Sequence, residues 1–300
     1  MYVVTGATGN TGHVVAKNLL AKGAKVRAIG RSTERLQALV SLGAEAFTAD
    51  LTDAPGLASA FTGANAVYLM VPPNLASSDF RAFQDRVVDA MVTAIRSAGV
   101  TYAVTLSSIG ADKSENTGPV VGLYNMEQRL NQIDRLNVLH LRAGYFMENT
   151  LAQIGIIQEI GVALGPLRPD LELPMIATQD IGAAAADALL KLDFRRAQTR
   201  ELLGARDLTM SEAAGMIGKA IAKPELQYSQ APQEQVRPAL LALGMSPNGA
   251  DLILKMSDAL NSGYMRALEE RSAANTTPTS YETFVKEEFL PRYEGKPAAA

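Results

Sequence analysis

Residues 1–12 read Met-Tyr-Val-Val-Thr-Gly-Ala-Thr-Gly-Asn-Thr-Gly, and this stretch decides the fold. The two valines belong to a buried strand that runs directly into a turn with glycine at every third position, Gly6, Gly9 and Gly12. An apolar helix pattern follows at once, carried by Val14, Val15, Leu19 and Leu20. A strand, a glycine turn and a helix start in this order are typical of a cradle for the pyrophosphate of a dinucleotide.

The three glycines have different expected roles in that cradle. Gly6 permits the tight turn, Gly9 lets the backbone approach the phosphates, and Gly12 lets the helix pack close to the strand. The other residues of the turn are assigned to the cofactor site with them: Ala7, Thr8, Asn10 and Thr11. A plain strand-to-helix turn without a ligand is the alternative, and the flanking strand and helix favour the dinucleotide.

The composition of the 300 residues limits the other functions. A net charge of −3 predicts no general attraction to nucleic acid or to an anionic membrane surface. Cysteine is absent and there are only two histidines, so thiolate chemistry and a histidine-rich metal site are excluded and no metal is expected. The chain starts in a core strand and has no long apolar run, so we expect a cytoplasmic protein without a signal peptide or membrane span.

Strand and helix patterns alternate through the first half of the chain. Repeated βα units of this length predict an α/β fold with a Rossmann-type, doubly wound parallel sheet. Apolar runs without clean alternation fit strands that are buried on both faces. The expected strands after the first are 25–29, 46–49, 66–71, 102–106 and 138–141, and the expected helices are 33–42, 53–61, 77–98 and 120–133.

The rhythm changes after Asn149. We expect residues 1–150 to form a domain that binds NAD(P), and residues 151–300 to form a smaller, mostly helical α/β region on the substrate side. A return of residues 178–205 to the Rossmann sheet is left open. Within this second half the pattern predicts helices at 151–160 and 181–192, a helix from Thr209 or Ser211 to about Ala222, and a short strand at 201–203.

The residue after the second strand discriminates between the two nicotinamide cofactors. NAD-specific sites usually carry an acidic residue there to accept a hydrogen bond from the ribose 2′-hydroxyl, whereas this chain has Arg31, with Arg35 one turn further on. An arginine favours the 2′-phosphate of NADP through a charge-assisted bond. We therefore expect NADPH to be preferred over NADH, although a solvated arginine at a helix entrance is the simpler alternative.

Two further strand ends supply expected cofactor contacts. Asp50 and Leu51 close the third strand, where the carboxylate can accept a bond from the adenine amino group while the leucine packs on the ring. Met70, Val71 and Pro72 close the fourth strand beside the expected path of the ribose. Core packing alone would also explain Leu51 and Met70.

The proton donor of short-chain dehydrogenases is missing. Those enzymes use Tyr-x-x-x-Lys, in which the lysine lowers the tyrosine pKa and the tyrosine protonates the new alkoxide. None of the nine tyrosines has lysine four residues on; Tyr124 is the best placed and has Gln128 there. Arg129 is one position off and is not a substitute. Tyr124 is either a donor in the pocket or merely a helix residue.

This absence limits the chemistry that we expect. An ordinary ketone gives a basic alkoxide and needs a positioned acid, whereas a quinone or a cationic dye gives a stabilised product and needs mainly orientation and exclusion of water. The end of the sixth strand lies at the edge where ligands bind, so Ala143, Gly144, Tyr145 and Phe146 are assigned to the cofactor. The expected acceptor pocket has apolar side chains, namely Phe80, Tyr145, Phe146, Met147 and Met175.

Several of these motifs together resemble one family. They are Thr5-Gly-Ala-Thr-Gly-Asn-Thr-Gly12, Gly30-Arg31, Ala49-Asp50-Leu51, Glu127 with Leu130, and Leu141-Arg-Ala-Gly-Tyr-Phe-Met-Glu-Asn149. The pattern is similar to the NmrA-like, atypical short-chain dehydrogenases and reductases, in particular their NADPH:quinone oxidoreductase and triphenylmethane reductase branches. The last block is the most discriminating, because the glycine motif is shared by many dehydrogenases.

Three functions are compatible with these observations. The resemblance and the missing acid favour an NADPH-dependent oxidoreductase that passes hydride to a quinone-like or other electrophilic acceptor. The alternative is a non-catalytic dinucleotide sensor that regulates a protein partner, because the resemblance includes such regulators. An epimerase or ordinary ketone reductase fits least, since both need Tyr-x-x-x-Lys. A homo-oligomer or a regulatory protein partner remains compatible with either of the first two functions.

Overall fold

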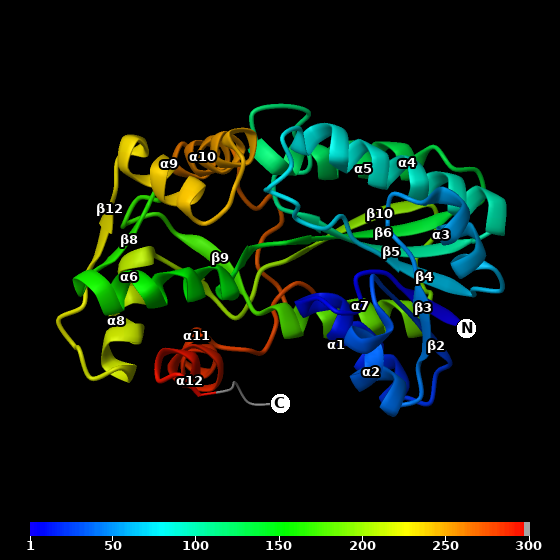
Figure 1. Ribbon diagram of the computed structural model, residues 1–300, viewed down its shortest axis with the longest axis horizontal. Coiled ribbons are helices and arrows are strands. Elements are labelled where there is room, and N and C mark those ends of the chain that lie inside the picture. Colours follow the sequence, from blue (N-terminus) through cyan, green and yellow to red (C-terminus); the bar gives the residue numbers. More distant parts are fainter. Residues whose placement is uncertain (297–300) are drawn as a thin grey trace.

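A seven-stranded parallel sheet forms the centre of the computed structural model, which describes residues 1–296 (Figure 1). The strand order is β10-β6-β5-β4-β1-β2-β3, so the winding reverses between β1 and β4. Ligands of such sheets bind at that reversal, beyond the carboxyl ends of the strands. The strands are β1 (Tyr2–Val4), β2 (Val26–Gly30), β3 (Glu45–Thr48), β4 (Ala66–Leu69), β5 (Tyr102–Ser108), β6 (Asn137–Ala143) and β10 (Ala197–Leu202).

Helices cover both faces of this sheet, which confirms the predicted Rossmann-type fold. Helices α1 (Asn10–Ala21), α2 (Thr33–Ser41) and α7 (Thr178–Lys191) pack on one face, and α3 (Ala54–Phe61), α4 (Phe80–Ala98) and α5 (Val121–Asn131) pack on the other (Figure 1). Neighbouring residues of a strand enter opposite cores: Val4 belongs to the core beneath α1, α2 and α7, and Val3 to the core beneath α3, α4 and α5. This explains why the strands read as continuous apolar runs.

Residues 178–202 belong to the Rossmann unit. Strand β10 pairs with β6 from Ala197 opposite Val138 to Leu202 opposite Ala143, and α7 packs against α1. The strand begins at Ala197, four residues before the predicted start at 201. The prediction missed its first half, which is exposed at the sheet edge. That half therefore carries no apolar pattern to read.

The remaining elements form a second unit with its own core. It contains η2 (Met147–Ala152), α6 (Gln153–Ile160), α8 (Met210–Ala220), α9 (Gln233–Ala242), α10 (Pro247–Asn261), α11 (Tyr281–Phe284), a π-helix (Val285–Phe289) and α12 (Leu290–Tyr293). Five short strands make two small sheets: β7 (Tyr145–Phe146), β9 (Leu173–Ile176) and β11 (Asp207–Leu208), and β8 (Ala163–Gly165) with β12 (Tyr228–Gln230). Most of these strands have two or three residues, too few for a periodic pattern.

Several predicted helix boundaries were wrong by one to three residues; helix α7, for example, begins at Thr178 rather than at residue 181. Helix α4 begins at Phe80 rather than at residue 77, because Asp79 is its N-cap and accepts a bond of 2.9 Å from the Ala82 amide. Ser77 lies before the helix and donates its hydroxyl to the Asp79 carbonyl oxygen. Residues 77–79 therefore form the end of a loop that contacts the candidate site.

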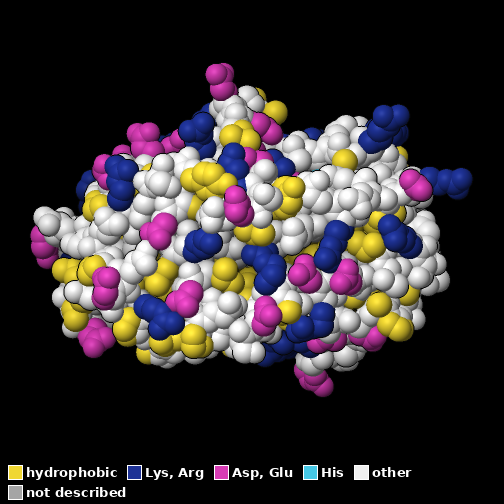
Figure 2. Space-filling view, turned by 90° about the horizontal axis from the view of Figure 1, so that it is seen from above, with side chains coloured by type: hydrophobic (Ala, Val, Ile, Leu, Met, Phe, Trp, Pro, Cys, Tyr) yellow, Lys and Arg dark blue, Asp and Glu magenta, His cyan; other side chains and the backbone are white. Residues whose placement is uncertain are grey.

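The described surface carries charges of both signs. On the face shown in Figure 2, basic and acidic side chains are interspersed and apolar side chains occur in small groups. Within residues 1–296, none of the helices has the length and apolarity needed to cross a membrane. The same residues hold no group of three or more His, Asp or Glu side chains arranged for a metal ion.

Candidate functional site

A cavity of about 470 Å³ lies at the carboxyl ends of β1 to β4, where the sheet reverses its winding. Four segments that are distant in sequence meet there: the glycine turn, the end of β2, the end of β3 and the loop after β4. Eight of the residues assigned to the cofactor line it: Gly6, Thr8, Gly9, Arg31, Asp50, Leu51, Met70 and Pro72. The lining also includes residues that were not assigned to the cofactor, namely Ile29, Gly30, Arg35, Ala49, Pro73, Asn74 and Phe83.

The glycine turn has the geometry that its sequence requires. Gly6 has φ of +60°, and a Cβ there would lie 2.7 Å from the sulfur of Met70. A Cβ on Gly12 would collide with the carbonyl oxygen of Gly6. The first turn of α1 can therefore lie this close to the end of β1 only because residue 12 is glycine. The Ala7 amide donates to the Ile29 carbonyl at 3.1 Å, which ties the turn to β2.

The start of α1 is suited to an anion. Gly9 is the N-cap and offers no side chain to the first N–H groups of the helix. These groups are left without a partner in the helix itself and carry its positive dipole end. A Cβ on Gly9 would have only the Gly6 carbonyl oxygen within 4 Å, at 3.3 Å, so the space beyond belongs to the cavity. A pyrophosphate therefore fits these residues.

Buried hydroxyl groups fix the turn to β4. Thr5 donates its hydroxyl to the Tyr68 carbonyl at 2.9 Å and accepts from the Met70 amide at 3.2 Å. The Tyr68 hydroxyl donates to Thr11 Oγ1 at 3.0 Å, and burial raises the pKa of Tyr68. The Thr11 side chain thus has a structural partner inside the protein, whereas Thr8 lines the cavity.

The adenosine end of the cavity carries two arginines and one carboxylate. Arg31 and Arg35 line the cavity, and within the described residues neither forms an ion pair with a carboxylate. Asp50 Oδ1 accepts from the amide of Thr52 at 2.8 Å and from its hydroxyl at 2.6 Å. These bonds, with a smaller contribution from Arg31, lower the pKa of Asp50, so it is a fixed anion at neutral pH.

The structure separates the residues at the end of β6 from this cavity lining. Ala143 is buried in the sheet core. The Gly144 amide donates to the Leu202 carbonyl at 2.9 Å, and a Cβ there would collide with the carbonyl oxygen of Pro174. Val71 packs on the core under α3 and α4. Their packing accounts for these residues without a ligand.

The residues expected around the acceptor fall into two places. Tyr145 and Phe146 form β7 opposite Met175 and Ile176 of β9, and Met147 follows them, so four of the five lie together. Met147 and Met175 are buried in the core of the second unit. Phe80 is instead at the start of α4 and is buried, and its ring stacks on Phe83 at 6.3 Å between centroids. Phe83, three residues on, lines the cavity.

Burial holds the side chains of Tyr145 and His140 in their neutral form. Burial raises the pKa of Tyr145 to about 12. The imidazole of His140 is bonded to Thr105 Oγ1 at 2.8 Å and to Asn131 Oδ1 at 2.9 Å, and burial lowers its pKa to about 4. His140 is therefore a hydrogen-bonded core residue.

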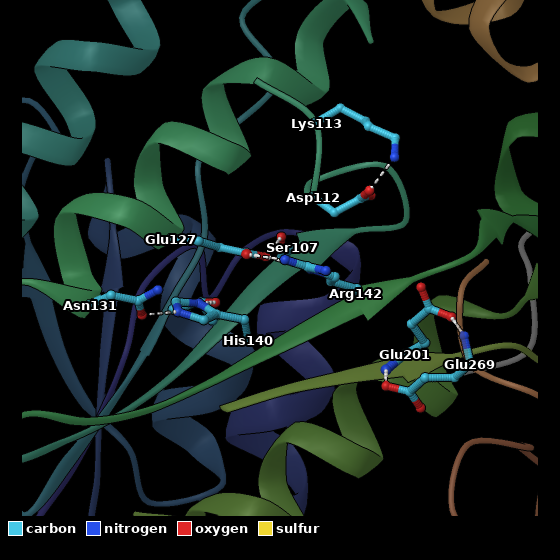
Figure 3. Close-up of polar contacts among 10 residues, drawn as sticks. Ser107, Asp112, Lys113, Glu127, Asn131, His140, Arg142, Glu201 and Glu269 are labelled. Carbon is cyan, nitrogen blue, oxygen red and sulfur yellow. Dashed lines mark hydrogen bonds and ion pairs between the residues drawn. The ribbon is translucent and has the colours of Figure 1, made fainter. Parts of the chain in front are cut away.

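Helix α5 carries a buried carboxylate three residues after Tyr124. Glu127 is 1% exposed, and its Oε1 accepts from Ser107 Oγ at 2.6 Å and from Arg142 Nε at 3.0 Å. Arg142 Nη2 donates to the other carboxylate oxygen at 2.6 Å. Figure 3 shows Ser107, Glu127 and Arg142 pointing toward one another from α5, β5 and β6. Tyr124 itself is half-buried, and Gln128 is exposed. Sequence reasoning noted Glu127 but did not foresee its two partners.

The parallel sheet, the glycine turn and the cavity at the winding reversal define a Rossmann-type nucleotide-binding protein. The NmrA-like family matches residues 2–290, and the chain belongs to that family. This confirms the resemblance that the sequence motifs carried.

Individual relatives agree with this assignment. The chain is 28% identical over 255 residues to quinone oxidoreductase 2 of Escherichia coli, covering 84% of this chain and 85% of that protein. It superposes on a crystal structure of an NADPH-dependent quinone oxidoreductase of E. coli in complex with NADPH, with a TM-score of 0.75, 24% identity, and 100% and 96% of the two chains covered. A Citrobacter triphenylmethane reductase in complex with NADP(H) gives a TM-score of 0.77 at 20% identity, with 94% and 98% covered.

Proposed function

We propose that this protein is an NADPH-dependent oxidoreductase that transfers a hydride to a quinone-like or other electrophilic acceptor. The observation that carries the proposal is the cavity that joins a glycine turn, Arg31, Arg35 and Asp50 at the winding reversal of the sheet. The similarity to a quinone oxidoreductase of E. coli over most of both chains supports the same function. Under this proposal the eight assigned residues that line the cavity contact the cofactor.

Each group would have a separate task in binding NADPH, which supplies the hydride. The first-turn amides of α1 would hold the pyrophosphate, with Gly9 leaving it room. Arg31 and Arg35 would bind the 2′-phosphate, and Asp50 Oδ2 would accept from the adenine amino group. Met70 and Phe83 would exclude water from the ribose side.

No proton donor is needed for such acceptors. The buried phenol of Tyr145 has a raised pKa, and Tyr124 has Gln128 where a lysine would activate it. A quinone takes up negative charge that its ring stabilises, and a cationic dye becomes neutral. Orientation in a dry pocket then supplies most of the catalysis.

The alternative function is a dinucleotide sensor that acts on a protein partner. The absence of Tyr-x-x-x-Lys favours it, because binding a dinucleotide requires no acid. The two functions differ in one measurement: a sensor binds NADPH but does not oxidise it with any quinone or dye.

Tyr124→Phe is expected to slow quinone reduction by less than about tenfold, because a true proton donor typically contributes roughly 10²–10⁴-fold. Steady-state NADPH oxidation with a quinone, in wild type and variant, measures the effect. A defect in the larger range, together with efficient reduction of a simple aliphatic ketone by the wild type, would show that Tyr124 is an acid and that the proposed acceptor class is wrong.

Arg31→Ala is expected to weaken NADPH binding by about 1.5–3 kcal/mol, the usual contribution of a hydrogen bond to a charged group. NADH binding should change little, since NADH has no 2′-phosphate. Calorimetric titration with both cofactors provides the comparison, and Arg266→Ala, at an exposed arginine outside the cavity lining, is the matched control. Equal affinities of the wild type for NADPH and NADH would exclude the assigned role of Arg31.

A further inference from the structure

The loop between β4 and α4 connects the cavity with the second unit. Its first part, Pro72, Pro73 and Asn74, lines the cavity. Its second part, residues 75–79, leaves the cavity and lies against the start of α10, which belongs to the second unit. One short loop therefore contacts the proposed cofactor and a helix that is about half the chain away in sequence (Figure 1).

Three hydrogen bonds join this loop and the first residue of α4 to the N-terminus of α10. The Ser246 amide donates to the Leu75 carbonyl at 2.9 Å, and Ser246 Oγ donates to the Ser77 carbonyl at 2.6 Å. Asn248 Oδ1 accepts from the Phe80 amide at 2.9 Å, which satisfies the first N–H of α4. We call these three bonds the loop clamp.

The backbones at the loop clamp are in direct contact. A Cβ on Gly249 would collide with the carbonyl oxygen of Leu75, so no larger residue fits between α10 and the loop. Further along α10, a Cβ on Gly118 would collide with the Leu252 carbonyl oxygen, which places the segment after β5 against the same helix. Arg81, at the start of α4, donates to the Gly118 carbonyl at 3.0 Å and links the two contacts. The N-terminal half of α10 thus supports both segments.

We propose that Ser246 and Asn248 are positioning residues for the dinucleotide, which act through the loop after β4. Because the loop clamp fixes residues 75–80, it holds Pro72 to Asn74 in the conformation that closes the cavity. Cofactor binding and order at the start of α10 are then coupled, and the coupling is reciprocal. Loss of the loop clamp weakens cofactor binding, and bound cofactor stabilises the loop clamp. This inference rests on the proposed function, since it takes NADPH as the ligand of the cavity.

Asn248→Ala removes the acceptor for the Phe80 amide and is expected to weaken NADPH binding by roughly 5–20-fold, the lower part of the usual range for coupled sites. Asn248→Asp keeps an acceptor at the positive end of α4 and should bind NADPH nearly as the wild type does. Gln235→Ala, at an exposed residue of α9, is the matched control. Calorimetric titration measures the affinities, and thermal unfolding without cofactor separates coupling from a general loss of stability.

Hydrogen exchange of the wild type tests the same coupling without any variant. NADPH is expected to protect the backbone amides of residues 77–80 and 249–252, and Ser246→Ala should lose part of that protection. Wild-type protein that does not bind NADPH would overturn the proposed function and the coupling together. Normal NADPH binding with unchanged exchange at these amides, or an unchanged affinity in a folded Asn248→Ala, would overturn the coupling and leave the proposed function standing.

Discussion

Gly9→Val is expected to abolish NADPH binding and leave the protein folded. Gly9 has φ of −97° and ψ of 172°, an extended conformation that valine adopts readily. Its Cβ would meet only the Gly6 carbonyl oxygen, at 3.3 Å, so the branched methyl groups would project into the cavity where the pyrophosphate is expected. The affinity should fall by roughly 100-fold or more, equivalent to about 2.7 kcal/mol.

Calorimetry and circular dichroism together decide this prediction. The matched control is Gly215→Val in α8, where an added Cβ has no heavy atom within 4 Å and lies outside the cavity lining. That variant should bind NADPH as the wild type does. A folded Gly9→Val protein with normal NADPH affinity would mean that Gly9 only shapes the turn and that the pyrophosphate lies elsewhere.

Glu127→Ala is expected to destabilise the protein by about 3–5 kcal/mol, the usual cost of removing one partner from a buried ion pair. Arg142, whose side chain is 14% exposed, would lose its only ion-pair partner among the described residues, and Ser107 Oγ would lose its acceptor. Glu127→Gln keeps one oxygen for these donors and should lose less. Urea unfolding at neutral pH measures the free energy of each variant.

A surface residue provides the comparison for this effect. Glu159→Ala, at an exposed position of α6, should change the free energy of unfolding by less than about 0.5 kcal/mol. If the free energy of unfolding fell by less than about 1 kcal/mol in Glu127→Ala, Arg142 would have to find another partner. Asp112 and Glu201 are the other carboxylates whose charges act on it.

The sequence was sufficient for the Rossmann unit because its signals are local. The glycine turn is decided by three residues within seven positions, and the apolar runs of β4 and β5 report burial on both faces. The first half of β10 was not predicted, because an exposed edge strand needs no apolar side chains. Strands of two residues, such as β7, are formed by the pairing of distant segments and leave no periodic trace.

The same distinction applies to the candidate site. Arg31 and Asp50 follow predicted strands, so the shared edge of a parallel sheet brings them together without further information. The pair of Glu127 and Arg142 depends on the relative rotation of α5 and β6, which no local pattern encodes. The contact of Asn248 with Phe80 joins two units across 168 positions. Phe80 and Phe83 lie close together along α4, and only packing decides which ring faces the cavity.

Reduction of a panel of acceptors tests the central claim most directly. Purified protein with saturating NADPH is given benzoquinones, naphthoquinones, cationic triarylmethane dyes and simple aliphatic ketones, and the loss of NADPH absorbance is followed. We predict turnover with quinones or dyes and none with aliphatic ketones, and loss of that turnover in Gly9→Val. Tight NADPH binding without oxidation by any quinone or dye would contradict the proposed reductase and favour the sensor.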